Sequence, residues 1–324
     1  MIKWGVIGTA DIAKGCTIPG MKNAYNCDMY AIAGRNIDKA NQFKDEYGFK
    51  VAYGSYDELL ADNEIEAVYI ALPNDLHYEW CMKAFKAGKH VLCEKPLAPS
   101  KKETEELFAA AKEAGVILTE AFAYLHTPYV AALKEDVNSG IIGDIKYIES
   151  AFLVQSMAET NFRNFRENYG GAMYDLGCYS ISLFTYLFDM LPVRAEGMAE
   201  FTKENIDVFS SAYFIYENGI RASLNCGMIF GNERFSRMDR LYIHGTKGCI
   251  KSDTEYNQQG NLSYRIIIDG KETVKTIPVK HNYQLEVERL GECITDGKKP
   301  LVTPEFSIMN AEVIDIALKA IGYN

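Results

Sequence analysis

The chain has 324 residues, of which 48% are hydrophobic and 24% charged, and its formal net charge is −10. This length predicts two domains, because single cores stop growing near about 250–300 residues, and the acidic balance argues against nucleic acid as a partner. The eight cysteines form no C-x-x-C pair or zinc spacing, and no apolar run approaches about 18 residues. We therefore expect reduced thiols, no metal site, no membrane span and a cytoplasmic location. Since the first residues already read as a strand, we expect no signal peptide.

The first 120 residues alternate strand and helix patterns. Apolar runs predict strands at 2–7, 28–34, 50–53, 67–72, 90–95 and 116–122, with helical patterns between them. Ser55 and Ser100 are typical helix N-caps, and Gly88 and Gly115 are typical helix ends. Apolar strands that alternate with helices indicate a parallel sheet covered on both faces. We expect a doubly wound α/β domain over 1–122.

Residues 123–324 follow a different pattern. Helices are expected at about 128–139, from Gly170 onward, at 283–296 and at 306–321, with a strand at 145–155 and seven strand-like runs between 192 and 279. Short turns such as ENG and IDG join neighbouring runs, so the sheet should be mostly antiparallel. We predict an α+β domain with a large open sheet. One face of such a sheet is covered either by helices or by a second copy, and the second possibility predicts a homodimer or homotetramer.

The first strand ends in a glycine-containing turn. The sequence GVIGTADIA places Gly8, Thr9, Ala10, Asp11 and Ile12 between that strand and the next helix. Read as G-x-A-x-x-A, it is a relaxed form of the dinucleotide fingerprint: a tight turn, a small residue near the pyrophosphate, and helix N–H groups that face the anion. A generic strand–helix turn is the alternative, but the position after the first strand favours a Rossmann-type nucleotide site.

The end of the second strand bears on the choice between NAD and NADP. An acidic residue there would bind the ribose 2′-hydroxyl, but the sequence AGRNIDK presents Arg35 and, four residues on, Lys39. Two cations fit a 2′-phosphate better. NADP(H) is therefore favoured over NAD(H), with a solvated helix start as the alternative.

Two later strands also end in polar residues. Leu72, Pro73, Asn74 and His77 follow the strand at 67–72, and Glu94 and Lys95 end the strand at 90–95. Ligands of such sheets lie outside the carboxyl ends of the strands, so these residues are candidates for the nicotinamide end of the cofactor. Alternatively, His77 is a helix-start histidine and the lysine a surface turn residue.

The sequence GGAMYDLGCYSI raises the question of why an apolar helix carries an Asp and a Tyr. Asp175 and Tyr179 are four residues apart, so on a helix they share a face at about 5–6 Å. A buried carboxylate is costly unless it is paired. They form either a satisfied polar pair in a core or the wall of a pocket, where Gly177 would permit close approach.

These segments occur together in one family's order. GVIGTADIA, AGR, ALPNDLH, CEKP, EAFAYLHTP, IGDIKYI and GGAMYDLGCY resemble the glucose–fructose oxidoreductase/inositol dehydrogenase/MocA family over nearly the whole chain. Tyr at 179, where many members carry His, resembles the dimeric dihydrodiol dehydrogenase and D-xylose dehydrogenase branch, which generally uses NADP.

The resemblance implies an oxidoreductase that acts on a sugar, cyclitol or dihydrodiol. It implies that Lys95 and Tyr179 are the catalytic pair and that Asp175 orients substrate. His126 is retained and is expected to reach substrate hydroxyls. Arg163 matches an arginine that the branch often places before the glycines and is a candidate substrate contact, with a solvated loop arginine as the alternative. A nearby ammonium favours the phenolate form of tyrosine, which makes Lys95 a plausible tuning partner for Tyr179. The alternatives are a non-catalytic NADP-binding sensor and a redox-neutral enzyme that retains its cofactor.

Two positions depart from the family pattern. Tyr169 replaces the first of three glycines, and Leu125 replaces a common arginine. The first change is expected to narrow the pocket, and the second to alter one substrate or dimer contact.

Overall fold

The computed structural model describes residues 1–231, 237–253, 256 and 259–323. The chain forms two compact units, one of residues Met1–His126 and Lys280–Ser307 and the other of Thr127–Val279 and Ile308–Asn324. The division into domains at 122/123 stays a prediction. The chain passes from the first compact unit to the second at 126/127, and residues Lys280–Ser307 belong again to the first unit.

The first unit is built around a six-stranded parallel sheet. Its order is β3-β2-β1-β4-β5-β6, so the direction of winding reverses between β1 and β4. The strands are β1 (Ile2–Ile7), β2 (Cys27–Ala33), β3 (Val51–Tyr53), β4 (Ala67–Ile70), β5 (His90–Glu94) and β6 (Leu118–Ala121). The helical segments are η1 (Ala13–Thr17), α1 (Ile18–Asn23), α2 (Ile37–Tyr47), α3 (Tyr56–Ala61), α4 (Asn74–Lys86), α5 (Lys101–Glu113), η2 (Ala123–His126) and α8 (Asn282–Asp296).

The helices of this unit begin and end where the sequence predicted. Ser55 Oγ accepts the backbone N–H of Glu58 at 3.2 Å, and Ser100 Oγ accepts that of Glu103 at 3.3 Å. Helices α1 and α8 bury their apolar residues in one core with Trp4 of β1 and Tyr69 of β4. The doubly wound α/β domain is therefore confirmed, and the contribution of α8 to its core is a new finding.

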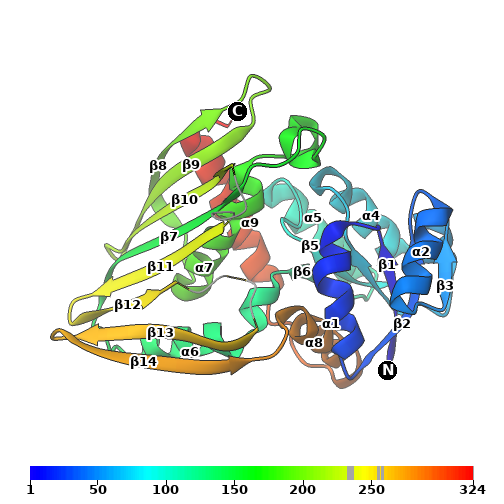
Figure 1. The fold of residues 1–324 in the computed structure, drawn as a ribbon, viewed down its shortest axis with the longest axis horizontal. Coiled ribbons are helices and arrows are strands. Elements are labelled where there is room, and N and C mark those ends of the chain that lie inside the picture. Colours follow the sequence, from blue (N-terminus) through cyan, green and yellow to red (C-terminus); the bar gives the residue numbers. More distant parts are fainter. Residues whose placement is uncertain (232–236, 254–255, 257–258, 324) are drawn as a thin grey trace. The chain divides into compact units, whose positions relative to one another are not determined.

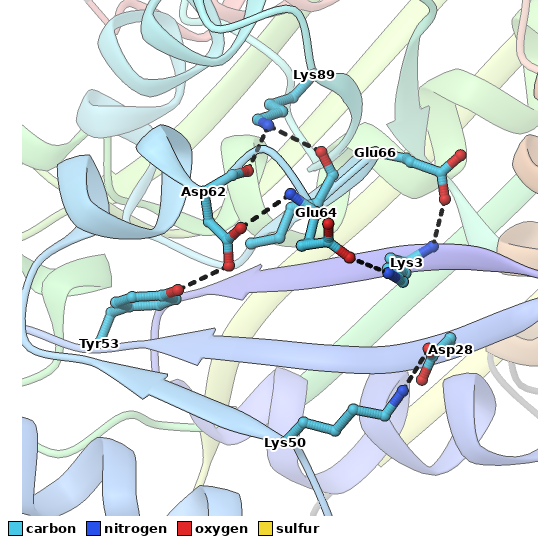
Figure 2. A network of polar contacts seen from close by, with 9 residues as sticks. Lys3, Asp28, Lys50, Tyr53, Asp62, Glu64, Glu66 and Lys89 are labelled. Atoms are coloured by element: carbon cyan, nitrogen blue, oxygen red, sulfur yellow. Dashed lines mark hydrogen bonds and ion pairs between the residues drawn. The ribbon is translucent and has the colours of Figure 1, made fainter.

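Paired charges occupy the amino ends of the strands (Figure 2). Lys3 Nζ pairs with Glu64, and its backbone N–H donates to Glu66 at 2.9 Å. The buried Lys89 donates to the carbonyl oxygens of Asp62 and Ile65 at 2.7 and 2.8 Å. These contacts lie at the end of the sheet opposite the carboxyl ends of the strands, where ligands of this fold bind.

The second unit contains an eight-stranded sheet in the order β14-β13-β12-β11-β7-β10-β9-β8. All its pairings are antiparallel except that of β7 with β10. The strands are β7 (Ile145–Gln155), β8 (Pro192–Phe201), β9 (Asp207–Tyr216), β10 (Arg221–Phe230), β11 (Arg237–Gly245), β12 (Gly248–Ser252), β13 (Gly260–Ile268) and β14 (Lys271–Val279). The helical segments are α6 (Pro128–Asn138), η3 (Phe162–Asn164), η4 (Arg166–Asn168), η5 (Met173–Gly177), α7 (Cys178–Phe188) and most of α9 (Pro304–Ile321).

One face of this sheet carries helices. In Figure 1, α6 and α7 lie along the same side of the strands. On the opposite face, the register places Met198 in line with Ser211, and Tyr213 in line with Ser223. Met198 and Tyr213 are exposed. The predicted mostly antiparallel open sheet is confirmed, and its outer face bears apolar side chains.

Among the described residues, no helix is long and apolar enough to cross a membrane. The described residues also hold no group of three or more His, Cys, Asp or Glu side chains that could hold a metal ion.

Candidate active site

The turn after β1 has the geometry of a phosphate-binding turn. Gly8 has φ +107°, and a Cβ at this position would lie 2.4 Å from the carbonyl oxygen of Ala71. Helical structure begins at Asp11, directly after Thr9 and Ala10, and Ala13 is fully buried where that helix packs. Close backbone approach at a helix N-terminus suits an anion such as pyrophosphate. The residues present therefore fit a dinucleotide.

The predicted 2′-phosphate cations lie beside this turn. Lys39 Nζ donates to the carbonyl oxygen of Thr9 at 3.0 Å, and a Cβ on Gly34 would lie 3.2 Å from Thr9 Cγ2. Burial raises the pKa of Tyr56, and the charge of the exposed Arg35 opposes that rise. The end of β2 thus presents two cations next to the phosphate turn.

His77 joins the ends of two neighbouring strands. Its Nδ1 is 2.9 Å from the carbonyl oxygen of Pro96, and its Nε2 is 2.9 Å from that of Leu72. The ring is fully buried, and burial lowers the pKa of His77. The His77 side chain thus links the turn after β4 to the turn after β5. If a cofactor binds at these strand ends, His77 would act indirectly, by positioning Pro73, Asn74 and Lys95.

Glu94 ends β5 within a buried polar cluster. It accepts the hydroxyl of Tyr69, which in turn accepts the hydroxyl of Thr17 at 2.9 Å. Glu286 of α8 is 1% exposed, and neither of its carboxyl oxygens has a hydrogen-bond partner among the described residues. Burial, together with the charge of Glu94, raises the pKa of Glu286 well above its ordinary value. Glu94 also accepts the backbone N–H of Lys95 at 3.3 Å, and the peptide bond between Lys95 and Pro96 is cis.

Glu120, at the end of β6, is a second buried acid near Lys95. It accepts the backbone N–H of Leu97 at 2.9 Å and the hydroxyl of Ser307 at 2.7 Å. Burial raises the pKa of Glu120 to about 7, although its two hydrogen bonds and the charge of Lys95 oppose the shift. No sequence pattern singled out Glu120, although EAF places it at a strand end.

Glu120→Gln is expected to change the pH dependence of stability. Because the folded-state pKa is raised from 4.5 to about 7, the wild type should lose stability as pH rises through this window, by up to about 3 kcal/mol. Glutamine cannot ionise, so the variant should gain stability relative to wild type between pH 4.5 and about 7. Urea unfolding across this range, with the exposed Glu113→Gln as control, measures the difference. Parallel curves for wild type and Glu120→Gln would contradict the assignment.

His126 is the last residue of the segment Met1–His126 of the first unit. One of its two ring nitrogens, Nε2, is buried and has no hydrogen-bond partner among the described residues. Burial and the charge of Arg289 lower the pKa of His126 to about 3. The neutral ring can therefore form a hydrogen bond with a hydroxyl group, and the substrate contact of His126 stays a prediction.

In the second unit, two glycines precede the predicted catalytic helix. A Cβ on Gly170 would lie 2.3 Å from the carbonyl oxygen of Arg163, and one on Gly171 would lie 2.0 Å from Asp207 Oδ1. Asp207 is fully buried, and its Oδ2 accepts the backbone N–H of Met173 at 2.8 Å. Both glycines are needed because the loop folds back on itself over this carboxylate.

Gly171→Ala is expected to destabilise the protein by about 2–4 kcal/mol. The side chain would add the strain of a positive φ, +109° here, to a clash with Asp207. Gly219→Ala is the control, because Gly219 has φ +82° but no atom within 4 Å of its ideal Cβ. Denaturant unfolding should therefore show a larger loss for Gly171→Ala than for Gly219→Ala. Equal losses would show that the contact with Asp207 is unimportant.

Asp175 is paired with a charged partner. Its Oδ1 lies 2.8 Å from Nε of Arg163, so the sequence-predicted Asp and Arg lie together. Asp175 lies in η5, a π-helical segment that runs into α7. A Cβ on Gly177 would lie 2.5 Å from Met173 Sδ and 3.2 Å from Cys226 Sγ. The atoms that approach Gly177 closely therefore come from Met173 of the same helical segment and from Cys226 of β10.

Tyr179 lies in an aromatic cluster that the sequence analysis missed. Its ring centroid is 5.3 Å from that of Phe152 and 5.4 Å from that of Tyr256. Phe152 comes from β7 and Tyr256 follows β12, so the three rings are far apart in sequence. Nothing in the local pattern around Tyr256 indicates this contact.

The structure also shows how the two departures from the family pattern are accommodated. Tyr169 adopts a left-handed conformation, with φ 51° and ψ 48°, which is ordinarily a glycine position. Its ring packs edge-on against Tyr174 at 6.0 Å. Leu125 is buried.

Two family models match the chain. The model described as "Oxidoreductase family, NAD-binding Rossmann fold" matches residues 2–122, and the model "GFO/IDH/MocA C-terminal domain" matches residues 130–251. Over 96% of its length the chain is 32% identical to D-xylose 1-dehydrogenase (NADP(+)) 2 of Haloferax volcanii, of which 95% is covered. It is 27% identical to trans-1,2-dihydrobenzene-1,2-diol dehydrogenase of Xenopus tropicalis over 99% of this chain and 98% of that protein.

A solved structure resembles the whole chain. The 3-ketoreductase KijD10 of Actinomadura kijaniata, in complex with NADP and TDP-benzene, has a TM-score of 0.91 at 27% identity and covers 99% of this chain and 98% of its own. A tyrosine-to-phenylalanine variant and a lysine-to-alanine variant of that reductase have also been solved with both ligands.

Proposed function

Because the chain belongs to the GFO/IDH/MocA family of NAD(P)-dependent oxidoreductases, we propose that it transfers a hydride between NADP(H) and a hydroxylated carbon. The substrate class is a sugar, cyclitol or dihydrodiol. The observation that carries the proposal is the Arg163–Asp175 pair at the start of the helix that bears Tyr179. A paired carboxylate beside a phenol suits recognition of neighbouring hydroxyl groups.

In the proposed mechanism, Tyr179 moves the proton. During oxidation its phenolate oxygen takes the hydroxyl proton of the substrate, and during reduction its phenol returns a proton to the developing alkoxide. The nicotinamide, when bound, accepts or supplies the hydride. The family resemblance assigns Lys95 the role of favouring the phenolate form. The resemblance assigns Asp175 the role of orienting the substrate through its hydroxyl groups, and the neutral His126 is a candidate for a further hydroxyl contact.

The preference for NADP(H) rests on charge. Arg35 and Lys39 provide two cations near Thr9, which suits a phosphate dianion on the ribose. The relatives support this choice, because the Haloferax enzyme is named for NADP(+) and KijD10 was solved with NADP.

We propose that the chain forms a homodimer or homotetramer. The interface would be the outer face of the eight-stranded sheet. Met198 and Tyr213 place exposed apolar side chains on this face, and burial of such a patch favours association. We expect light scattering to give a mass of two or four chains and Met198→Asp to reduce it. A single-chain mass for the wild type would reject the assembly.

Turnover tests the proposed function directly. The purified protein is incubated with NADP⁺ or NAD⁺ and a panel of aldoses, cyclitols and dihydrodiols, and reduced nicotinamide is followed with time. We expect turnover with NADP⁺ on at least one class. Firm binding of NADP(H) with no turnover on any class would instead favour a sensor, and a cofactor retained through purification would favour a redox-neutral enzyme.

A further inference from the structure

Tyr256 and Phe152 enclose the ring of Tyr179. Phe152 meets that ring edge-on at 69°, and Tyr256 packs on it at 46°. The two enclosing rings also stack on each other, with centroids 5.3 Å apart and an angle of 23°. Tyr179 is 8% exposed, so these neighbours limit the orientations that its ring can adopt.

Tyr256 is itself fixed at both ends. Its hydroxyl is 2.6 Å from Ser150 Oγ, which is 2.8 Å from Ser180 Oγ, the residue after Tyr179. Its backbone N–H donates to Asp239 at 2.9 Å. Burial raises the pKa of Tyr256 to about 12, so its hydroxyl stays protonated and can donate.

The remaining charges of this cluster are satisfied. Arg237 makes two hydrogen bonds to Asp239, at 3.2 and 3.0 Å, and its guanidinium lies 4.6 Å from the ring centroid of Phe152. Arg237 therefore packs against the ring of Phe152, while Asp239 accepts the backbone N–H of Tyr256. The cluster is thus a support built from β7, β11 and Tyr256.

We propose that Tyr256 is a positioning residue, which holds the phenol of Tyr179 in the orientation required for proton transfer. Proton transfer needs the donor and acceptor oxygens within hydrogen-bond reach, and a displacement of about 1 Å can cost about 10²-fold in rate. The predicted effect on kcat rests on the proposed function, in which Tyr179 transfers the proton. The restraint on the ring is independent of the reaction.

Tyr256→Leu removes the stacked ring, and Tyr256→Phe removes only the hydroxyl. Tyr129→Leu is the matched control, because buried Tyr129 also bonds a serine, Ser252, and packs edge-on against a tyrosine 5.4 Å away. We expect Tyr256→Leu to lower kcat at least tenfold, with KM and the Kd of NADPH within twofold of wild type. Tyr256→Phe should keep most of the activity, and Tyr129→Leu should keep all of it.

Fluorine NMR tests the restraint without any turnover. Difluorotyrosine, with one fluorine on each side of the hydroxyl, is placed at position 179. A restrained ring gives two resonances and a freely flipping ring gives one, so the two signals should merge in Tyr256→Leu and persist in Tyr129→Leu. Two unchanged resonances in Tyr256→Leu, or a kcat equal to that of Tyr129→Leu, would overturn the inference.

The two possible failures can be told apart. If Tyr179→Phe retains full activity, the proposed catalytic role fails, while the NMR signals still report whether Tyr256 restrains the ring. If Tyr179→Phe is inactive and Tyr256→Leu behaves as wild type, only the role of Tyr256 fails.

Discussion

Tyr179→Phe is expected to lower kcat/KM by about 10²–10⁴-fold, because the variant has no group that can exchange a proton with the substrate. Lys95→Met should cause a loss of similar order, since the phenolate form of Tyr179 would lose its ammonium partner. Tyr186→Phe is the control, because Tyr186 lies in the same helix α7 and is half-buried. Steady-state kinetics on the best substrate of the panel measures all three.

Binding of NADPH separates chemistry from folding in these variants. Tyr179→Phe should bind NADPH with the affinity of wild type, because the residues proposed to hold its phosphates, in the turn Gly8–Ile12 and at Arg35 and Lys39, are unchanged. If either catalytic variant keeps kcat/KM within threefold of wild type, the proton-transfer role of that residue is wrong.

The double variant Arg35→Ala/Lys39→Ala is expected to lower kcat/KM for NADP⁺ by about 10²–10⁴-fold. Each charge-assisted contact to a phosphate contributes about 1.5–3 kcal/mol, and alanine removes both cations. The value for NAD⁺, which lacks the 2′-phosphate, should change less than threefold. Lys44→Ala, on the same helix α2, controls for the loss of surface charge.

The ratio of the two kcat/KM values is the quantity to compare. A fall in the kcat/KM for NADP⁺ relative to that for NAD⁺ would show that Arg35 and Lys39 bind the 2′-phosphate. An equal loss for NADP⁺ and NAD⁺ would mean that the two residues support the turn at Thr9 rather than select the cofactor.

The sequence predicted the secondary structure well because its signals are local. Ser55 and Ser100 cap the helices as expected, and the strand at 145–155 has the predicted bounds. The parallel pairing of β7 with β10 and the return of α8 to the first unit were not predicted. Both depend on contacts between segments far apart in the chain, which periodicity does not reveal.

The candidate site was predicted less completely. Asp175 and Tyr179 were found because they interrupt an apolar helix, and Arg163 because it matches a family motif. The partnership of Arg163 with Asp175 required three-dimensional structure. Tyr256, Glu120 and Glu286 were missed, since each acts through burial and distant neighbours.

Gly177 shows how one residue can be interpreted incorrectly from sequence alone. A glycine inside a helix signals close approach, and a ligand was the expected neighbour. In the structure the neighbours are the sulfur atoms of Met173 and Cys226. The pattern revealed the tight packing but not the atoms responsible for it.

The most direct test of hydride transfer uses the active substrate of the panel, deuterated at the carbon that bears the reacting hydroxyl. After incubation with NADP⁺, mass spectrometry locates the deuterium. We predict that the label appears in the reduced nicotinamide ring of NADPH and that formation of NADPH slows relative to unlabelled substrate. Label that stays in the product, or is lost to solvent while NADP⁺ is unchanged, would contradict the proposed oxidoreductase reaction.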